Sequence, residues 1–190
     1  MNLLDHFFAD RQKARDEKDS TANLCWAASV SEGAPQVRTL ILRDLHDRLA
    51  LFINATSPMW HELEKTPGVA IVAFFGSLNV QYRFDCLTQP IADHKVHESW
   101  HLRPDPPKRM DWFYTRTQPQ SSVIADRSAL LDALADLDLP EPLVAPPTAR
   151  GLYLNPHRIE RLDLTQPNGV HDRVQARLVD GQWVHNTLVP

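Results

Sequence analysis

Short stretches in which apolar and polar residues alternate recur along the chain, and this period of two is typical of half-buried β-strands. Two such stretches flank a polar segment at 44–48 and two more flank Gly76-Ser77, so each pair predicts a hairpin. Asp180-Gly181 is a strong two-residue hairpin signal near the end. The predicted strands cover residues 22–30, 36–43, 49–54, 69–75, 79–90, 151–154, 158–164, 173–179 and 182–188.

Helical signals are confined to a few segments between or before these strands. Apolar residues between Leu3 and Phe8 recur at helical spacing, and Ser57 has the character of a helix cap followed by proline in the first turn. Many short strands with few helices predict a closed antiparallel barrel with helices packed outside. The predicted helices cover residues 2–18, 57 to about 66, 92–101, a short segment around 112–114 after a proline-rich loop at 104–107, and 129–137.

Two arginines, Arg38 and Arg43, stand in the same predicted strand. They are an odd number of residues apart, so simple alternation places them on opposite faces. A guanidinium on a half-buried strand needs an anionic partner, because burying it unpaired is very costly. A bound phosphate for one and a carboxylate for the other would meet this need. For Arg38, an internal ion pair with one of the 24 acidic residues is an equally good interpretation.

Length, charge and cysteine content narrow the class of protein. A chain of 190 residues predicts one domain, 1–190, with a full core. The net charge of −4 comes from mixed acidic and basic residues, which gives nucleic-acid binding little support. No apolar run approaches membrane-spanning length, and the N-terminus lacks a signal-peptide pattern. Two cysteines in strand-like runs, Cys25 and Cys86, are typical of buried thiols in a reducing cytoplasm.

Several short motifs occur in a particular order from about residue 22 to the end. They are Pro35 to Arg43, the strand–Ser57–helix step, Gln81, Arg103-Pro104, Gln120-Ser121, Ile159-Glu160, His171-Asp172-Arg173 and Trp183 to Pro190. This order resembles the pyridoxamine 5′-phosphate oxidase family. The resemblance implies a mainly β, α+β fold, an antiparallel Greek-key split β-barrel with peripheral helices. It also implies a homodimer with two FMN sites at the subunit interface.

The resemblance implies site residues where the chain matches the family. Arg38 and Arg173 would contact FMN, Gln81 would lie near the ring, and Gln120-Ser121 would reach FMN from the other subunit. Arg103 and His171 would contact the substrate, no residue is assigned to a metal, and no catalytic residue is identified. The full cofactor set implied is Arg38, Thr39, Leu40, Arg43, Phe52, Ile53, Ser57, Gln81, Gln120, Ser121 and Arg173.

Some of these residues also have plain structural interpretations. The alternative for Gln81, beside the favoured role near the ring, is an exposed strand residue, and Gln120-Ser121 reads most simply as a solvated loop. The segment His171 to Arg173 suggests proton transfer, but three polar residues beside a glycine are more often a turn. Three histidines share one face of the predicted helix at 92–101 and suggest a metal or a haem, against the simpler interpretation of a solvated outer face: His94, His97 and His101.

Departures from the family pattern concern both the cofactor and the substrate. Pro58-Met59 follows Ser57 where the family usually places Arg-Lys on the FMN phosphate. Losing two cations there costs several kcal/mol, at roughly 1.5–3 kcal/mol per charged hydrogen bond. Leu162, Ser99 and Gly169 replace a flavin-packing tryptophan, a substrate tyrosine and a substrate arginine.

These departures predict a divergent FMN-binding oxidoreductase with a different small-molecule substrate. Two alternatives remain open at this point. One is a flavin or haem carrier or sensor without turnover. The other is a structural dimer that has lost FMN.

Overall fold

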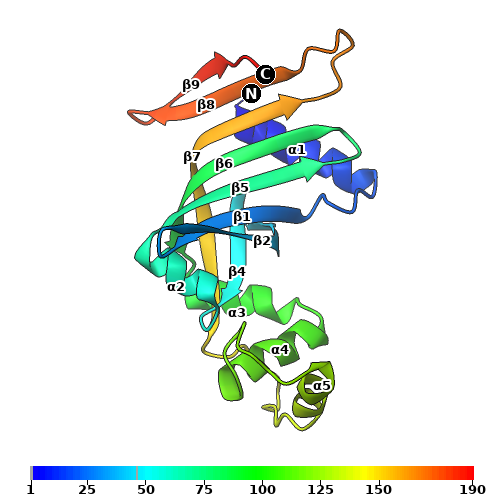
Figure 1. Cartoon of the computed structure of the whole chain (residues 1–190), viewed down its shortest axis with the longest axis vertical. Helices are drawn as coiled ribbons and strands as arrows, with labels where there is room; N and C mark the ends of the chain where they lie inside the picture. The colour runs from blue at the N-terminus through cyan, green and yellow to red at the C-terminus, as the bar shows by residue number, and fades with distance from the viewer. Residues whose placement is uncertain (1, 46) are drawn as a thin grey trace.

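The computed structural model describes residues 2–45 and 47–190, and shows an antiparallel sheet curled into a half-barrel with helices around it (Figure 1). Within that part of the chain the strands are β1 (Leu24–Ser31), β2 (Ala34–Ile41), β3 (Arg43–Leu45), β4 (Arg48–Asn54), β5 (Gly68–Phe75), β6 (Val80–Pro90), β7 (Ala149–Asp163), β8 (Asp172–Val179) and β9 (Gln182–Thr187). The helices are α1 (Leu3–Asp16), α2 (Pro58–Lys65), α3 (Asp93–His101), α4 (Asp105–Arg116) and α5 (Arg127–Ala135).

Strand β7 organises the sheet, whose order is β2-β1-β5-β6-β7-β4-β3. It pairs with β6 along its length, with β4 through its first residues and with β8 through its last ones. Strands β2 and β3 form the two ends of this order, and within the described residues they do not pair with each other. The closed barrel predicted from the strand pattern is therefore wrong, whereas the antiparallel split barrel with outer helices is confirmed.

Helix α1 lies alongside β5 and β6, and its inner face packs against the main core (Figure 1). The helix begins with a capping box in which Asn2 accepts hydrogen bonds from two backbone N–H groups. Phe7 on its inner face is fully buried, and its ring centroid lies 4.9 Å from that of Phe84 and 5.1 Å from that of Tyr82. Burial of such a side chain contributes about 1.5–3 kcal/mol, so α1 belongs to the core and is not an appendage.

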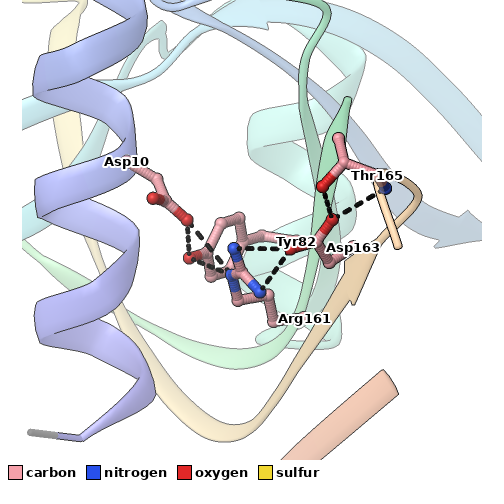
Figure 2. Close-up of polar contacts among 5 residues, drawn as sticks. All are labelled: Asp10, Tyr82, Arg161, Asp163 and Thr165. Carbon is pink, nitrogen blue, oxygen red and sulfur yellow. Dashed lines mark hydrogen bonds and ion pairs between the residues drawn. The ribbon is translucent and has the colours of Figure 1, made fainter. Parts of the chain in front are cut away.

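Polar contacts fasten the same helix to the sheet (Figure 2). The Tyr82 hydroxyl donates to Asp10 on α1 at 2.5 Å, and Arg161 on β7 donates to both at 3.1 Å. Asp163 accepts from Arg161 and from Thr165. Burial, and then the bond to Asp10, raise the pKa of Tyr82 well above its ordinary value, so the phenol stays protonated. Each polar group here has a protein partner, so we interpret this cluster as a structural contact that holds α1 against β6 and β7.

A second core joins α3 and α4 to β4 and β7 at the other end of the sheet (Figure 1). Trp100 and Trp112 are buried beside Ala50 and Tyr153. The Trp112 indole donates to the Val144 carbonyl at 2.8 Å. This core fixes the position of two helices that form one wall of the groove described below.

Most predicted elements are present, and the differences have local causes. The predicted strand at 36–43 breaks at the buried Leu42, so Arg38 lies in β2 and Arg43 in β3. The hairpin predicted across 44–48 is formed by β3 and β4, whereas β2 pairs with β1. Helix α2 and the β5–β6 and β8–β9 hairpins are confirmed. Asp180 and Gly181 have φ of +50° and +77°, as a primed turn requires.

Two proline positions explain the remaining differences. The predicted loop at 104–107 is wrong beyond Pro104, since α4 begins at Asp105 and holds Pro106 and Pro107 in its first turn, where no N–H is needed. The two strands predicted at 151–154 and 158–164 are one strand, β7. Pro156 is tolerated because the register shifts opposite it, between Asp85 and Cys86.

Candidate functional site

Two adjoining hollows of about 490 Å³ and 750 Å³ form one groove between the sheet and the helices α3 and α4. They share Leu40 of β2, Phe52 of β4, Arg103 and Pro107. Volumes in this range are usual for small-molecule and cofactor sites. Seven of the residues predicted from the sequence line the groove: Thr39, Leu40, Arg43, Phe52, Ile53, Arg103 and Gln120.

The groove also contains residues that the sequence did not mark. Asn54, Tyr114 and Arg150 line the hollow of about 490 Å³, and Lys95 lines the hollow of about 750 Å³. Tyr114 belongs to the amphipathic pattern that predicted a helix near 112–114, but that pattern does not assign it to a site. Arg150 becomes part of the groove only because β7 pairs with β4, where it lies opposite Ile53.

Charge in the groove is partly compensated and partly free. Arg103 forms an ion pair with Asp111, which is 7% exposed and also accepts from the Trp100 indole at 2.8 Å. Burial and then the nearby Asp111 raise the pKa of Tyr114. Within the described residues, neither Arg43 nor Lys95 forms an ion pair. An anionic group entering the groove would therefore meet these two cations together with the carboxylate of Glu98, which lines the same hollow.

Arg38 lies outside the groove lining and is held by an internal carboxylate. Its Nη2 donates to Glu62 Oε1 at 2.7 Å and its Nη1 to Glu62 Oε2 at 2.9 Å. Ser29 donates to the same carboxylate at 2.5 Å. Burial raises the pKa of Glu62, but the bonds from Arg38 and Ser29 outweigh it and hold this pKa below its usual range. Of the two interpretations of Arg38 offered by the sequence, the structure shows the internal ion pair.

The start of α2 contributes no positive charge to the region around Arg38. Ser57 is 4% exposed and caps the helix, its Oγ accepting from the Trp60 N–H at 3.1 Å. Met59 is 2% exposed and belongs to the main core. Pro58 has no N–H to offer. The residues present therefore suit the ring portion of a flavin in the groove better than they suit its phosphate.

A second cluster of predicted residues lies on β6, β7 and β8. Gln81 is paired with Leu162, and Leu162 with Arg173, so the three side chains form one row across the strands. Arg173 donates to the buried Glu160 at 2.9 Å. Burial raises the pKa of Glu160, but hydrogen bonds from Arg173 and Gln175 outweigh the effect of burial, so this pKa lies below its usual value.

The groove and this row lie toward opposite ends of β7 (Figure 1). One chain therefore does not bring all the predicted residues together. His171 and Ser121 are exposed and line neither hollow. Gln120 approaches the groove of its own chain, where its N–H donates to Thr56 Oγ1 at 3.1 Å. The helix histidines His94, His97 and His101 are exposed, and the described residues contain no cluster able to hold a metal ion.

Comparison of the amino-acid sequence with those of known proteins gives a consistent result. Residues 12–138 match the family model described as pyridoxamine 5′-phosphate oxidase. The pyridoxine/pyridoxamine 5′-phosphate oxidase of Pseudomonas putida (strain W619) is 30% identical over 202 residues, covering 99% of this chain and 87% of that protein. The protein of that name from Ectopseudomonas mendocina (strain ymp) is 31% identical over 193 residues, with the same two coverages of 99% and 87%.

Solved structures give the same fold. PhzG from Burkholderia lata 383, solved in complex with tetrahydrophenazine-1-carboxylic acid, superposes with a TM-score of 0.82 at 21% identity, covering 99% of this chain and 91% of that one. A pyridoxamine 5′-phosphate oxidase-related, FMN binding protein from Nostoc punctiforme PCC 73102 also gives 0.82, at 17% identity and coverages of 100% and 99%. At these identities the likeness concerns the fold.

Proposed function

Because the chain belongs to the pyridoxamine 5′-phosphate oxidase family, whose members are flavin-binding oxidoreductases, we propose that it binds FMN and oxidises or reduces a small molecule. One observation carries this proposal. The groove gathers residues of β2, β3, β4, the turn between α3 and α4, and the 118–122 loop that sequence similarity assigns to cofactor and substrate binding. These segments are far apart in sequence, and only the fold brings them to one place.

In this proposal the chain's own residues bind and orient the two ligands. Leu40, Phe52 and Ile53 provide apolar surface for a planar ring, and the Gln120 amide provides a hydrogen-bonding group at its edge. Arg43 and Lys95 attract the anionic group of a substrate. When bound, the flavin supplies the redox chemistry, and the protein supplies position, charge and exclusion of water.

We also propose that the working form is a homodimer. Gln81 and Arg173 lie far from the groove of their own chain, so they reach a flavin only if it belongs to a partner. A two-fold axis that brings the β6–β8 row of one chain to the groove of the other creates two identical sites. Val37 and Ile41 on the end strand β2 are 65% and 50% exposed, and such apolar side chains suit a subunit contact.

The substrate in this proposal is not a vitamin B6 phosphate. Ser99 and Gly169 replace residues that the family uses around that substrate, and Ser99 itself lines the groove. A reducing compartment, the cytoplasm, is part of the same proposal. It is supported by Cys25 and Cys86, both buried and free, with burial raising the pKa of Cys25 to about 12.

The proposal is tested by titrating FMN into the flavin-free protein while following the quenching of flavin fluorescence. We expect binding at micromolar protein, and we expect Phe52→Ala to weaken it about tenfold or more, since a large apolar surface is lost from the groove. Phe8→Ala, which removes a half-buried phenylalanine of α1 that lies outside the groove lining and outside the β6–β8 row, is the matched control and should leave the affinity unchanged. Absence of FMN binding at micromolar protein would reject the proposal.

A ligand-free structural dimer is the second candidate, and the Arg38–Glu62 ion pair is the observation that favours it. A carrier or sensor without turnover is a third possibility that the same protein can test. Bound flavin excludes the structural dimer. Steady-state turnover of the bound flavin with NAD(P)H and any electron acceptor argues against the carrier.

A further inference from the structure

The ion pair between Arg38 and Glu62 bears on how much the phosphate group of the cofactor contributes to its binding. We propose that Glu62 takes the place of the cofactor phosphate as the anionic partner of Arg38, so that FMN and its dephosphorylated form, riboflavin, bind with nearly equal affinity. This inference rests on the proposed flavin function and deepens it. It assigns to Glu62 the role of a specificity-determining residue.

The geometry makes Glu62 a complete partner for Arg38. Both terminal nitrogens of the guanidinium donate to the two oxygens of the carboxylate, at 2.7 and 2.9 Å. This fork-to-fork arrangement is the one in which an arginine also binds a phosphate. Nη1 additionally donates to Ser29 Oγ at 2.9 Å, so the two terminal nitrogens already have acceptors.

The surroundings hold this pair in place. The side chain of Glu62 is 8% exposed and Ser29 is 2% exposed, whereas Arg38 is 28% exposed. Moving Arg38 to a phosphate would leave the Glu62 carboxylate buried without its counter-ion, which is strongly unfavourable. A phosphate that approached the intact pair would meet no net positive charge and would be repelled by the carboxylate.

The start of α2 does not replace the missing charge, and in the hollow beside it the cation of Lys65 is accompanied by the carboxylates of Glu32 and Glu62. Pro58 and Met59 are uncharged where the family places two cations. The first turn of α2 is also largely occupied, because the N–H groups of Trp60 and His61 already donate to Ser57. The phosphate therefore gains little by binding here, and the ring portion in the groove determines the affinity.

The experiment measures the dissociation constants of FMN and riboflavin for the flavin-free full chain by fluorescence quenching. For the wild type we expect the two constants to differ by less than about tenfold. Glu62→Gln keeps the shape and removes the carboxylate charge, which leaves Arg38 uncompensated. We expect it to tighten FMN relative to riboflavin by about tenfold to a hundredfold, the range for a hydrogen bond to a charged group.

Two controls separate a local effect from a general one. Glu64→Gln removes the same charge from the same helix at an exposed position, where the side chain is 56% exposed, and should leave the ratio at the wild-type value. Adding Arg38→Gln to Glu62→Gln should abolish the gain, since the gain acts through the freed guanidinium. Because both ligands are measured on one preparation, a partly unfolded variant alters both constants and leaves their ratio intact.

The outcomes distinguish a failure of this inference from a failure of the proposed flavin-binding function. If both flavins bind and FMN is already preferred by more than tenfold, or if Glu62→Gln leaves the ratio unchanged, the inference is overturned and the flavin function stands. If neither flavin binds the wild-type chain, the proposed function fails and the inference fails with it.

Discussion

Replacing Phe7 by alanine tests whether α1 belongs to the core of the half-barrel. The Phe7 side chain is fully buried, and its ring contacts Phe75, Tyr82 and Phe84 at centroid distances of 5.6, 5.1 and 4.9 Å. Truncating a buried phenylalanine costs about 3–5 kcal/mol, from lost burial and from the cavity left behind. We expect the free energy of unfolding of Phe7→Ala to fall by this amount.

The assay is urea denaturation followed by circular dichroism, with a matched variant one residue away. Phe8 lies on the same helix and is only partly buried against the same core, so Phe8→Ala should cost roughly half as much. If Phe7→Ala cost no more than Phe8→Ala, or less than about 1 kcal/mol, α1 would not belong to the core of the half-barrel.

Two further predictions concern stability. Tyr82→Phe keeps the ring but removes the hydroxyl that donates to Asp10, so it should cost about 1.5–3 kcal/mol by the same denaturation assay, and a cost below about 0.5 kcal/mol would contradict the bonds in Figure 2. Burial raises the pKa of Asp19, but bonds from Ser77 and Thr21 outweigh it and lower this pKa to about 2. A carboxyl whose folded pKa is lowered stabilises the protein above its ordinary pKa, and this contribution is lost as pH falls from about 4 toward 2. Asp19→Asn should therefore flatten the dependence of stability on pH in this acid range, and an unchanged slope would contradict the assignment.

Much of the fold follows from signals that act over a few residues. Asp180-Gly181 fixes the β8–β9 hairpin because both positions need positive φ, which the turn chemistry reveals. The cap at Ser57 places the start of α2 for a similar reason. The β1–β2 hairpin is also local, because Glu32 and Gly33 have φ of +51° and +81° between the paired residues Ser31 and Ala34. The pairing of β1 with β5 and of β4 with β7 is different, since it joins strands that are distant in sequence.

The residues of the candidate site fall into the same two groups, those placed by local sequence signals and those placed by long-range contacts. The family motifs identified much of the groove, including Phe52 and Arg43, because the spacing of each motif is local. The partner of Arg38 was not predictable, since Glu62 reaches it only when α2 packs on β1. Arg150 likewise enters the groove through the pairing of β7 with β4. In each case a long-range contact determines the role of the residue.

The central claim is that the groove of one chain and the β6–β8 row of a second chain hold one flavin between them. Sedimentation of the flavin-loaded protein, followed by protein absorption and by the visible absorption of flavin, tests this claim directly. We predict one particle with twice the mass of a single chain and one flavin per chain. A flavin-bearing particle with the mass of one chain, or a dimer without flavin, would contradict it.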